Sequence, residues 1–314
     1  MKWCMVLLLA MGAVAQSQPA RRVFVVNKAG DSVAIINAAS LRVEKTIPVG
    51  RNPHELAVAP NGSRLYVPNV AGNSISVIDP RTGAETKKIS HSDFNSPHGV
   101  AFTPDSRRAL VTSEGSSKIF VIDAVADQVL KVIDTDQGGT HMAAVNKAGT
   151  RAYFTNRQAN TVSIMDLDNY RIVANVAVGR GAEGFALSPN EKEVWVGNRT
   201  DATISIIDVD RREVAATIPA KTNPIRLAFT PDGKYVLAPD GASGAVDVYE
   251  VSGRKRIQTI AVGSNPGGVV VAPDGMHAYV ACQSSGEIQV IDTQTWKVSG
   301  KIAVGASPDG ITFQ

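Results

Sequence analysis

The chain repeats one short apolar segment seven times, at intervals of 42–44 residues. Each segment ends in an acidic or amide residue, and these final residues are Asn37, Asp79, Asp123, Asp166, Asp208, Glu250 and Asp292. A constant period of this length is typical of solenoids, propellers and repeat arrays. The repeat therefore constrains the fold more strongly than any single residue does.

One repeat, residues 266–305, contains four short apolar runs at 267–271, 278–281, 288–291 and 298–304. The runs are rich in Val, Ile and Tyr, and Gly, Pro, Asp or Ser residues separate them, as expected for strands joined by tight turns. No window shows a sustained helical period. We therefore predict an all-β chain that folds as a seven-bladed β-propeller with four antiparallel strands per blade.

Both ends of the repeat array lie in the middle of a unit. Residues 22–26 match the second strand of the other units, whereas residues 307–313 match a first strand. We expect the C-terminal strand to complete the N-terminal blade, because closing the ring in this way leaves no unpaired sheet edge.

Several phrases resemble the Tyr-Val-Thr-Asn signature of the YVTN β-propeller repeat family. They are LYVPN at 65–69, YFTN at 153–156 and VWVGN at 194–198, and Val-Gly pairs end four units at Gly50, Gly179, Gly263 and Gly305. The chain is similar to YncE-like bacterial exported proteins and, more remotely, to lactonase and heme-d1 propellers. The resemblance implies the fold, but propellers host many unrelated activities, so it does not name a function.

The first fifteen residues differ from the repeats. Lys2 supplies a positive start, residues 6–11 are apolar, and residues 13–15 form a small-x-small site. We predict a signal peptide at 1–15 cleaved before Gln16, a leader at 16–21, and a single propeller domain at 22–314. The signal predicts a periplasmic or secreted protein. Its apolar stretch is too short to span a membrane. We also expect the protein to be a monomer.

Composition narrows the choice of partners. Loss of Lys2 with the signal lowers the net charge from +3 to +2, so no strong attraction to polyanions is expected. Trp195 and Trp296 fall within a strand and a distant turn, which argues against a stacking surface for nucleic acid. The mature chain keeps one cysteine, Cys282, which cannot form an internal disulfide and which we expect near the surface.

Aligning the repeats reveals a column of residues just inside the first strand of each blade, where a propeller lines its channel. The column reads His54, His98, His141, Glu183, Ile225, Gly267 and Asp309. Imidazoles beside carboxylates suit a divalent transition metal, so we predict a metal site from His54, His98, His141, Glu183 and Asp309. The alternative is a wet, polar channel mouth whose histidines were copied by duplication and bind nothing.

Two further columns predict ligand-binding residues. The next position carries Glu55 and Arg226 among glycines, which let backbone approach the channel axis. Arg226 is expected to hold an anionic group of a ligand, or alternatively to pair with Glu55 or Glu183. Glu114, Arg157 and Arg199 follow the second strands and form either a recognition surface or a solvated rim.

Two functions remain open at this level. The first is an exported, non-enzymatic binding propeller whose channel mouth and loops take a protein, glycan or small molecule. The second is a metal-dependent enzyme of lactonase, lyase or oxidase type at the same place. Convergence of the His54, His98 and His141 rings on one point would favour the metal; splayed rings would favour the scaffold.

Overall fold

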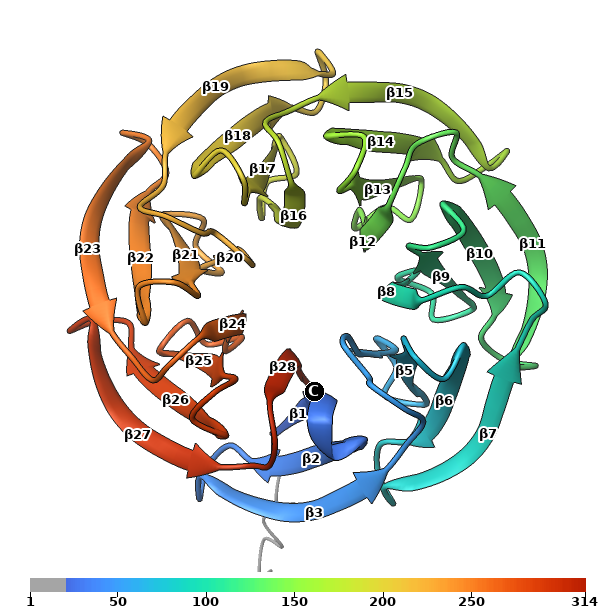
Figure 1. Cartoon of the computed structure of the whole chain (residues 1–314), viewed down its shortest axis with the longest axis horizontal. Helices are drawn as coiled ribbons and strands as arrows, with labels where there is room; N and C mark the ends of the chain where they lie inside the picture. The colour runs from blue at the N-terminus through green and yellow to red at the C-terminus, as the bar shows by residue number, and fades with distance from the viewer. Residues whose placement is uncertain (1–20) are drawn as a thin grey trace, which may run out of the picture.

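The computed structural model describes residues 21–314, which form a closed ring of seven four-stranded antiparallel sheets (Figure 1). Apart from the single-turn 3-10 helix η1 (Lys28–Gly30), every regular element of these residues is a strand. The prediction of a seven-bladed all-β propeller is confirmed. We number the blades 1 to 7 in chain order, starting with the sheet β28-β1-β2-β3.

The innermost strand of each blade lines the channel, and the second strand contributes buried side chains to the core. The innermost strands are β28 (Pro308–Phe313), β4 (Ala57–Val58), β8 (Pro97–Phe102), β12 (Thr140–Val145), β16 (Ala182–Leu187), β20 (Ala228–Phe229) and β24 (Pro266–Val271). The second strands are β1 (Arg22–Asn27), β5 (Leu65–Asn69), β9 (Arg108–Ser113), β13 (Arg151–Asn156), β17 (Glu193–Asn198), β21 (Tyr235–Asp240) and β25 (His277–Cys282).

The third strands are almost entirely buried, whereas the outermost strands present mostly exposed side chains. The third strands are β2 (Ser32–Asn37), β6 (Ser74–Asp79), β10 (Lys118–Asp123), β14 (Thr161–Asp166), β18 (Thr203–Asp208), β22 (Ala245–Glu250) and β26 (Glu287–Asp292). The outermost strands are β3 (Arg42–Pro48), β7 (Ala84–Ser90), β11 (Gln128–Asp134), β15 (Arg171–Ala177), β19 (Glu213–Pro219), β23 (Lys255–Ala261) and β27 (Lys297–Ala303).

An acidic or amide residue ends every third strand, and most of these side chains shape the turn to the outermost strand. The Asp123 carboxylate accepts hydrogen bonds from the backbone N–H groups of Val125 and Ala126 at 2.8 and 2.9 Å. Asp208 and Asp292 accept the equivalent pairs of bonds in their own blades. Short polar side chains favour such turns, which explains why the repeat is so easily seen in the sequence.

Ring closure follows the predicted scheme. β28 pairs antiparallel with β1, with Val23 opposite Phe313 and Val25 opposite Ile311. The backbone N–H of Gln314 donates to the carbonyl of Arg22 at 2.9 Å and extends the pairing by one residue. Figure 1 shows the red C-terminal strand inside the blue N-terminal blade.

Each of the seven interfaces between adjacent blades contains its own cluster of buried apolar side chains. Between blades 1 and 2, Phe24 and Val26 pack against Leu65 and Val67. Between blades 5 and 6, Trp195 packs with Leu227 and other apolar residues. The core is therefore a ring of blade-to-blade contacts, and burial of this apolar surface is the main force that stabilises the closed fold.

The asparagine of the YVTN phrase and the glycine of the Val-Gly pair contact each other. Asn198 is fully buried, and its Nδ2 donates to Thr203 Oγ1 at 2.9 Å and Ser205 Oγ at 2.8 Å. A Cβ at Gly179 would lie 2.6 Å from Asn198 Cγ, so the loop entering blade 5 closes over the asparagine only when it carries glycine. Asn69 and Gly50 repeat this contact in blade 2.

The equivalent loop entering blade 7 explains why the prediction that Cys282 lies near the surface was wrong. Cys282 occupies the asparagine position of blade 7, where Gly263 covers it, and the residue is fully buried in the apolar cluster between blades 6 and 7. Burial raises the pKa of its thiol to about 11. The prediction of a surface thiol failed because the end of each second strand lies beneath the loop from the preceding blade.

The predicted signal peptide at 1–15, and all of the 16–21 leader except Arg21, lie outside the residues that the structure describes. Within residues 21–314, no helix has the length and apolar content to cross a membrane.

Candidate functional site

A regular interruption of the innermost strands brings the side chains of the channel mouth together. In β8, β12, β16 and β24 the register shifts near the start of the strand. In three of these strands the bulge carries Gly99, Gly184 or Gly268, whose added Cβ would lie 2.5 Å or less from a carbonyl oxygen of the next blade. The predicted glycine column thus lets neighbouring blades approach closely at the axis.

Two blades depart from this pattern. β4 and β20 are two residues long, and the column position before each carries a large charged side chain, Glu55 in blade 2 and Arg226 in blade 6. Both side chains are buried, and Arg226 Nε donates to Glu55 Oε1 at 3.0 Å across the channel. Arg226 therefore pairs with Glu55 within the protein, which was the alternative to its holding an anionic group of a ligand.

The residues of the aligned columns line one cavity of about 200 Å³ at the channel mouth. From the first column it contains His54, His98, His141, Glu183 and Asp309, and from the other columns Glu114, Arg157, Arg199 and Arg226. Nine of the ten predicted site residues thus share one cavity, and the tenth, Glu55, contacts it through Arg226.

His54 and His98 form a chain of hydrogen bonds that defines their tautomers. His54 Nε2 lies 3.0 Å from the carbonyl oxygen Oδ1 of Asn52, so it donates and leaves its Nδ1 as an acceptor. His98 Nε2 lies 3.1 Å from that Nδ1 and therefore donates to it. Burial lowers the pKa of His54 to about 4 and that of His98 well below its usual value, so both rings are neutral at pH 7.

His141 differs because two carboxylates flank it. Its Nδ1 lies 3.1 Å from Glu114 Oε2 and its Nε2 lies 3.5 Å from Glu183 Oε1. Burial alone would lower the pKa of His141, but these two carboxylates outweigh it and raise the pKa. Burial would likewise raise the pKa values of Glu114 and Glu183, and the contacts with His141 instead hold both below their usual range.

Two arginines cover these carboxylates from the solvent side. Arg157 lies 3.5 Å from both Glu114 and Glu183, and Arg199 lies 3.8 Å from Glu183. Their side chains are 40% and 45% exposed, respectively. Both arginines thus form ion pairs with these carboxylates, and within residues 21–314 neither guanidinium makes a side-chain hydrogen bond.

On the opposite side of the mouth, sequence reasoning missed the partners of Asp309. Lys28 Nζ lies 3.2 Å from Asp309 Oδ2, and Gln283 Nε2 donates to Asp309 Oδ1 at 3.0 Å. Lys28 and Gln283 occupy the same repeat position as Glu114, immediately after a second strand. This shared repeat position was the sequence signal that could have identified Lys28 and Gln283 as residues of the channel mouth.

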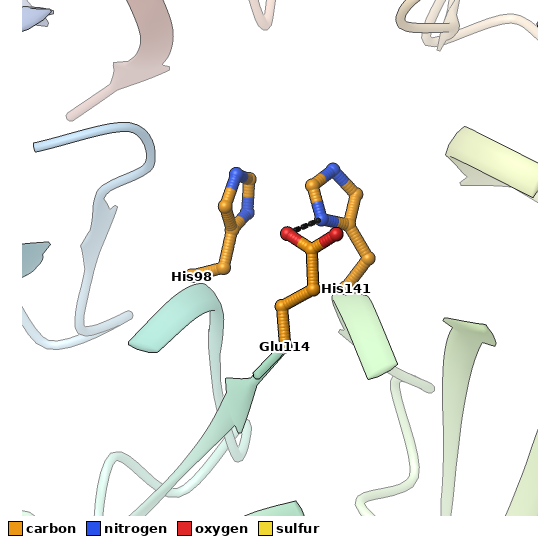
Figure 2. A group of neighbouring side chains, drawn as sticks. All are labelled: His98, Glu114 and His141. Carbon is orange, nitrogen blue, oxygen red and sulfur yellow. Dashed lines mark hydrogen bonds and ion pairs between the residues drawn. The ribbon is translucent and has the colours of Figure 1, made fainter. Parts of the chain in front are cut away.

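The three histidines do not converge on one point. His98 and His141 stack with ring centroids 3.8 Å apart, whereas His54 meets His98 edge-on at 4.9 Å. Instead, one ligand atom from each of His98, Glu114 and His141 lies within 4.8 Å of the others. Figure 2 shows the Glu114 carboxylate reaching up between the two imidazole rings. Glu114, predicted to bind a ligand, thus joins the group best placed to hold a metal.

A larger cavity of about 430 Å³ lies elsewhere, lined by Asp105, Arg108 and Tyr170 among others. Its arginine and tyrosine contact each other, and none of the buried polar atoms that lack a partner within residues 21–314 belongs to it. At the channel mouth, by contrast, His98 Nδ1, His141 Nε2 and Glu183 Oε2 are buried and have no hydrogen-bond partner among those residues. Buried polar groups normally have partners, so the channel mouth is the better candidate.

The fold and this polar channel mouth define a seven-bladed propeller with a central small-molecule-sized cavity. A family model for the YncE-like β-propeller matches residues 3–114 and 124–268, and the chain belongs to that family. YncE proteins of Salmonella typhi and Salmonella typhimurium are each 27% identical over 168 residues. That match covers 52% of this chain and 47% of each relative, so the chain spans about half the length of the curated relatives it matches.

Solved structures share the whole ring. Hydrazine synthase of Kuenenia stuttgartiensis superposes with a TM-score of 0.81 and 21% identity, over 91% of this chain and 99% of that chain. A functionally unknown protein from Desulfotomaculum acetoxidans also gives a TM-score of 0.81, at 15% identity over 93% of this chain and 98% of that one. At these identities the likeness shows the fold alone.

Proposed function

We propose that this chain is an exported binding propeller whose channel-mouth cavity takes a small anionic molecule, with a carboxylate as the recognised group. The observation that supports this most directly is the pair of half-exposed guanidiniums, Arg157 and Arg199, which make no side-chain hydrogen bond within residues 21–314 beyond their ion pairs with Glu114 and Glu183. Arginine presents a planar fork of N–H donors that matches a carboxylate in two parallel hydrogen bonds.

The size of the cavity favours a compact ligand. Its volume of about 200 Å³ is below the roughly 300–1,000 Å³ typical of sites for drug-sized molecules. The walls are rigid, because the lining residues lie on or next to strands of all seven blades. A preorganised cavity of this kind binds a small acid without a large ordering cost.

Export is part of the proposal and rests on the residues before the propeller. A positive residue, an apolar stretch and a small-x-small site precede Gln16. The ligand would therefore be met in the periplasm or outside the cell.

The test is calorimetric titration of the mature protein with acetate, succinate and tricarballylate. We expect at least one of these acids to bind, and we expect Arg157→Ala and Arg199→Ala each to weaken binding about tenfold or more, as the loss of a charge-assisted contact predicts. Arg211→Ala is the matched control, because Arg211 lies in the turn between β18 and β19 with its side chain 70% exposed. Absence of binding by all three acids, or equal loss in the control, would refute the proposal.

A second candidate, a metal-dependent enzyme, is favoured by one observation. His98, His141 and Glu114 form a two-histidine, one-carboxylate group beside the cavity, the donor set of several catalytic metal sites.

A further inference from the structure

We propose that His98, Glu114 and His141 bind one divalent transition metal ion of the Zn²⁺ class within the channel-mouth cavity. The inference deepens the proposed function and rests on it for the identity of the cavity as the ligand site. It differs from the predicted ligand set of His54, His98, His141, Glu183 and Asp309. Glu114 becomes a metal ligand, His54 and Glu183 orient the two ligating imidazoles, and Asp309 pairs with Lys28 and Gln283.

His98 offers a free nitrogen lone pair to a metal ion. Since His98 Nε2 donates to His54, the other ring nitrogen, Nδ1, carries no proton and is an acceptor. His98 is 2% exposed, and this Nδ1 is buried without a hydrogen-bond partner in residues 21–314. A buried, unsatisfied nitrogen lone pair costs free energy, and a metal ion would satisfy it.

The other two ligand atoms already face each other. His141 Nδ1 and Glu114 Oε2 are 3.1 Å apart. Two atoms bound to one tetrahedral ion at about 2.0–2.2 Å would be roughly 3.3–3.6 Å apart. All three ligand atoms lie within 4.8 Å of one another, so closure of the site requires small side-chain rotations of His98 or Glu114 and no movement of the strands.

The surroundings of the two imidazoles also suit metal ligands. A metal-bound histidine usually directs its other ring nitrogen to an acceptor, which orients the ring and strengthens it as a ligand. His98 donates to His54 Nδ1 in that place, whereas Glu183 Oε1 lies 3.5 Å from His141 Nε2 and needs a small shift to accept its proton. Both orienting residues are therefore present before any metal binds.

Two nitrogens and one carboxylate oxygen suit the borderline cations Zn²⁺, Cu²⁺ and Ni²⁺ better than Mg²⁺ or Ca²⁺. Binding replaces the proton that His141 Nδ1 shares with Glu114, and that proton passes to solvent. Three protein ligands leave at least one coordination position for water or for an anion held by Arg157 and Arg199.

The test uses the mature protein, exported in a bacterial host and purified without chelator. Metal content is measured by mass spectrometry, and Zn²⁺ affinity by competition with a chromogenic chelator after the protein has been stripped and dialysed. Co²⁺ loading gives an independent readout, because visible absorption bands report the coordination geometry. We expect one ion per chain and a four- or five-coordinate Co²⁺ spectrum.

His98→Ala and Glu114→Gln should each weaken Zn²⁺ binding more than about 100-fold, and Glu183→Gln about 10–100-fold as an orienting residue. Glu114→Gln keeps the side-chain volume, so it guards against a variant that simply fails to fold. The control is His277→Ala, since His277 starts β25 and does not line the cavity.

Failure of the wild-type chain to retain Zn²⁺ or Co²⁺, or binding that survives in both His98→Ala and Glu114→Gln, would overturn the inference. Carboxylate binding by the metal-free protein would then leave the proposed function standing. Stoichiometric metal with no affinity for any of the three acids would instead support the inference and refute the anionic-ligand proposal.

Discussion

Arg226 of blade 6 reaches across the channel to Glu55 of blade 2, with Arg226 Nε 3.0 Å from Glu55 Oε1, although the two residues are 171 positions apart in sequence. The pair joins two blades that are nearly opposite in the ring (Figure 1) and replaces the glycines that occupy this position in most blades. Burial opposes the charge of Arg226, but the carboxylates of Glu55, Asp309 and Glu183 outweigh it and raise its pKa.

Removing one member of this pair should destabilise the ring strongly. Arg226→Met leaves the buried Glu55 carboxylate without its arginine, and Glu55→Gln removes the charged acceptor of the buried Arg226 guanidinium. We expect each change to lower the free energy of unfolding by about 3–5 kcal/mol. The double variant should recover much of that loss, because no charge is then stranded. Urea denaturation of the wild type, the two single variants and the double variant gives the coupling free energy between the two residues. Additive effects of the two changes would contradict a direct pair.

The contact between Gly179 and Asn198 predicts a second coupled pair. Gly179→Ala forces a Cβ to within 2.6 Å of Asn198 Cγ and should cost about 1–3 kcal/mol by overpacking. Asn198→Ala removes two buried hydrogen bonds and should cost a similar amount. The double variant should be less destabilised than the sum, because the new methyl group fills the vacated space.

Gly253→Ala serves as the control for that cycle. A Cβ there would meet the flexible end of Glu250, so we expect a change within about 0.5 kcal/mol. Thermal or urea unfolding measures all of these variants, and an equal cost at Gly253 would mean that the loop contact is not the cause.

Ring closure by the last strand predicts complementation. A chain ending at residue 305 lacks β28 and exposes the hydrogen-bonding edge of β1, so it should unfold at a clearly lower temperature or aggregate. A synthetic peptide of residues 306–314 should restore the midpoint by adding the missing strand. The same peptide with Ile311→Pro loses a donor within the strand and should restore less; equal rescue would argue against strand addition.

The buried thiol of Cys282 predicts a decline of stability at high pH. Because the folded pKa of about 11 exceeds that of an exposed thiol, the folded chain keeps a proton that the unfolded chain loses. Stability from this group is complete below about pH 9 and falls between about pH 9 and 11, by up to about 1.4 kcal/mol per pH unit. Urea denaturation of Cys282→Ala should show a flatter pH profile over that interval.

Alkylation checks the same burial independently. At pH 8 iodoacetamide should modify Cys282 slowly in the native protein and rapidly in urea, since a buried neutral thiol is a poor nucleophile. Rapid reaction of the native protein would place the thiol at the surface.

Export predicts a defined mature end. Protein recovered from the periplasmic or extracellular fraction should begin at Gln16, as N-terminal sequencing would show. Replacing both Ala13 and Ala15 with Leu removes the small residues before the cleavage point and should leave the precursor uncleaved. Full-length protein confined to the cytoplasm would contradict the predicted signal.

The sequence alone determined the architecture, because a propeller is built from local rules repeated seven times. Alternating apolar runs, tight turns and the acidic or amide residue at each third-strand end act within one blade. The period of 42–44 residues and the mid-unit ends were therefore enough to predict both the blades and their closure. Alignment of the repeats also predicted which residues share the channel mouth, because equivalent positions in the repeats occupy equivalent places around the ring.

Tertiary structure decided which of those residues contact one another. His98, His141 and Glu114 group together while His54 turns to Asn52, and Arg226 selects Glu55 from the far side of the channel. The burial of Cys282 likewise depends on a loop from the preceding blade. These outcomes depend on side-chain orientation and on contacts between blades, and a one-dimensional repeat carries no information about either.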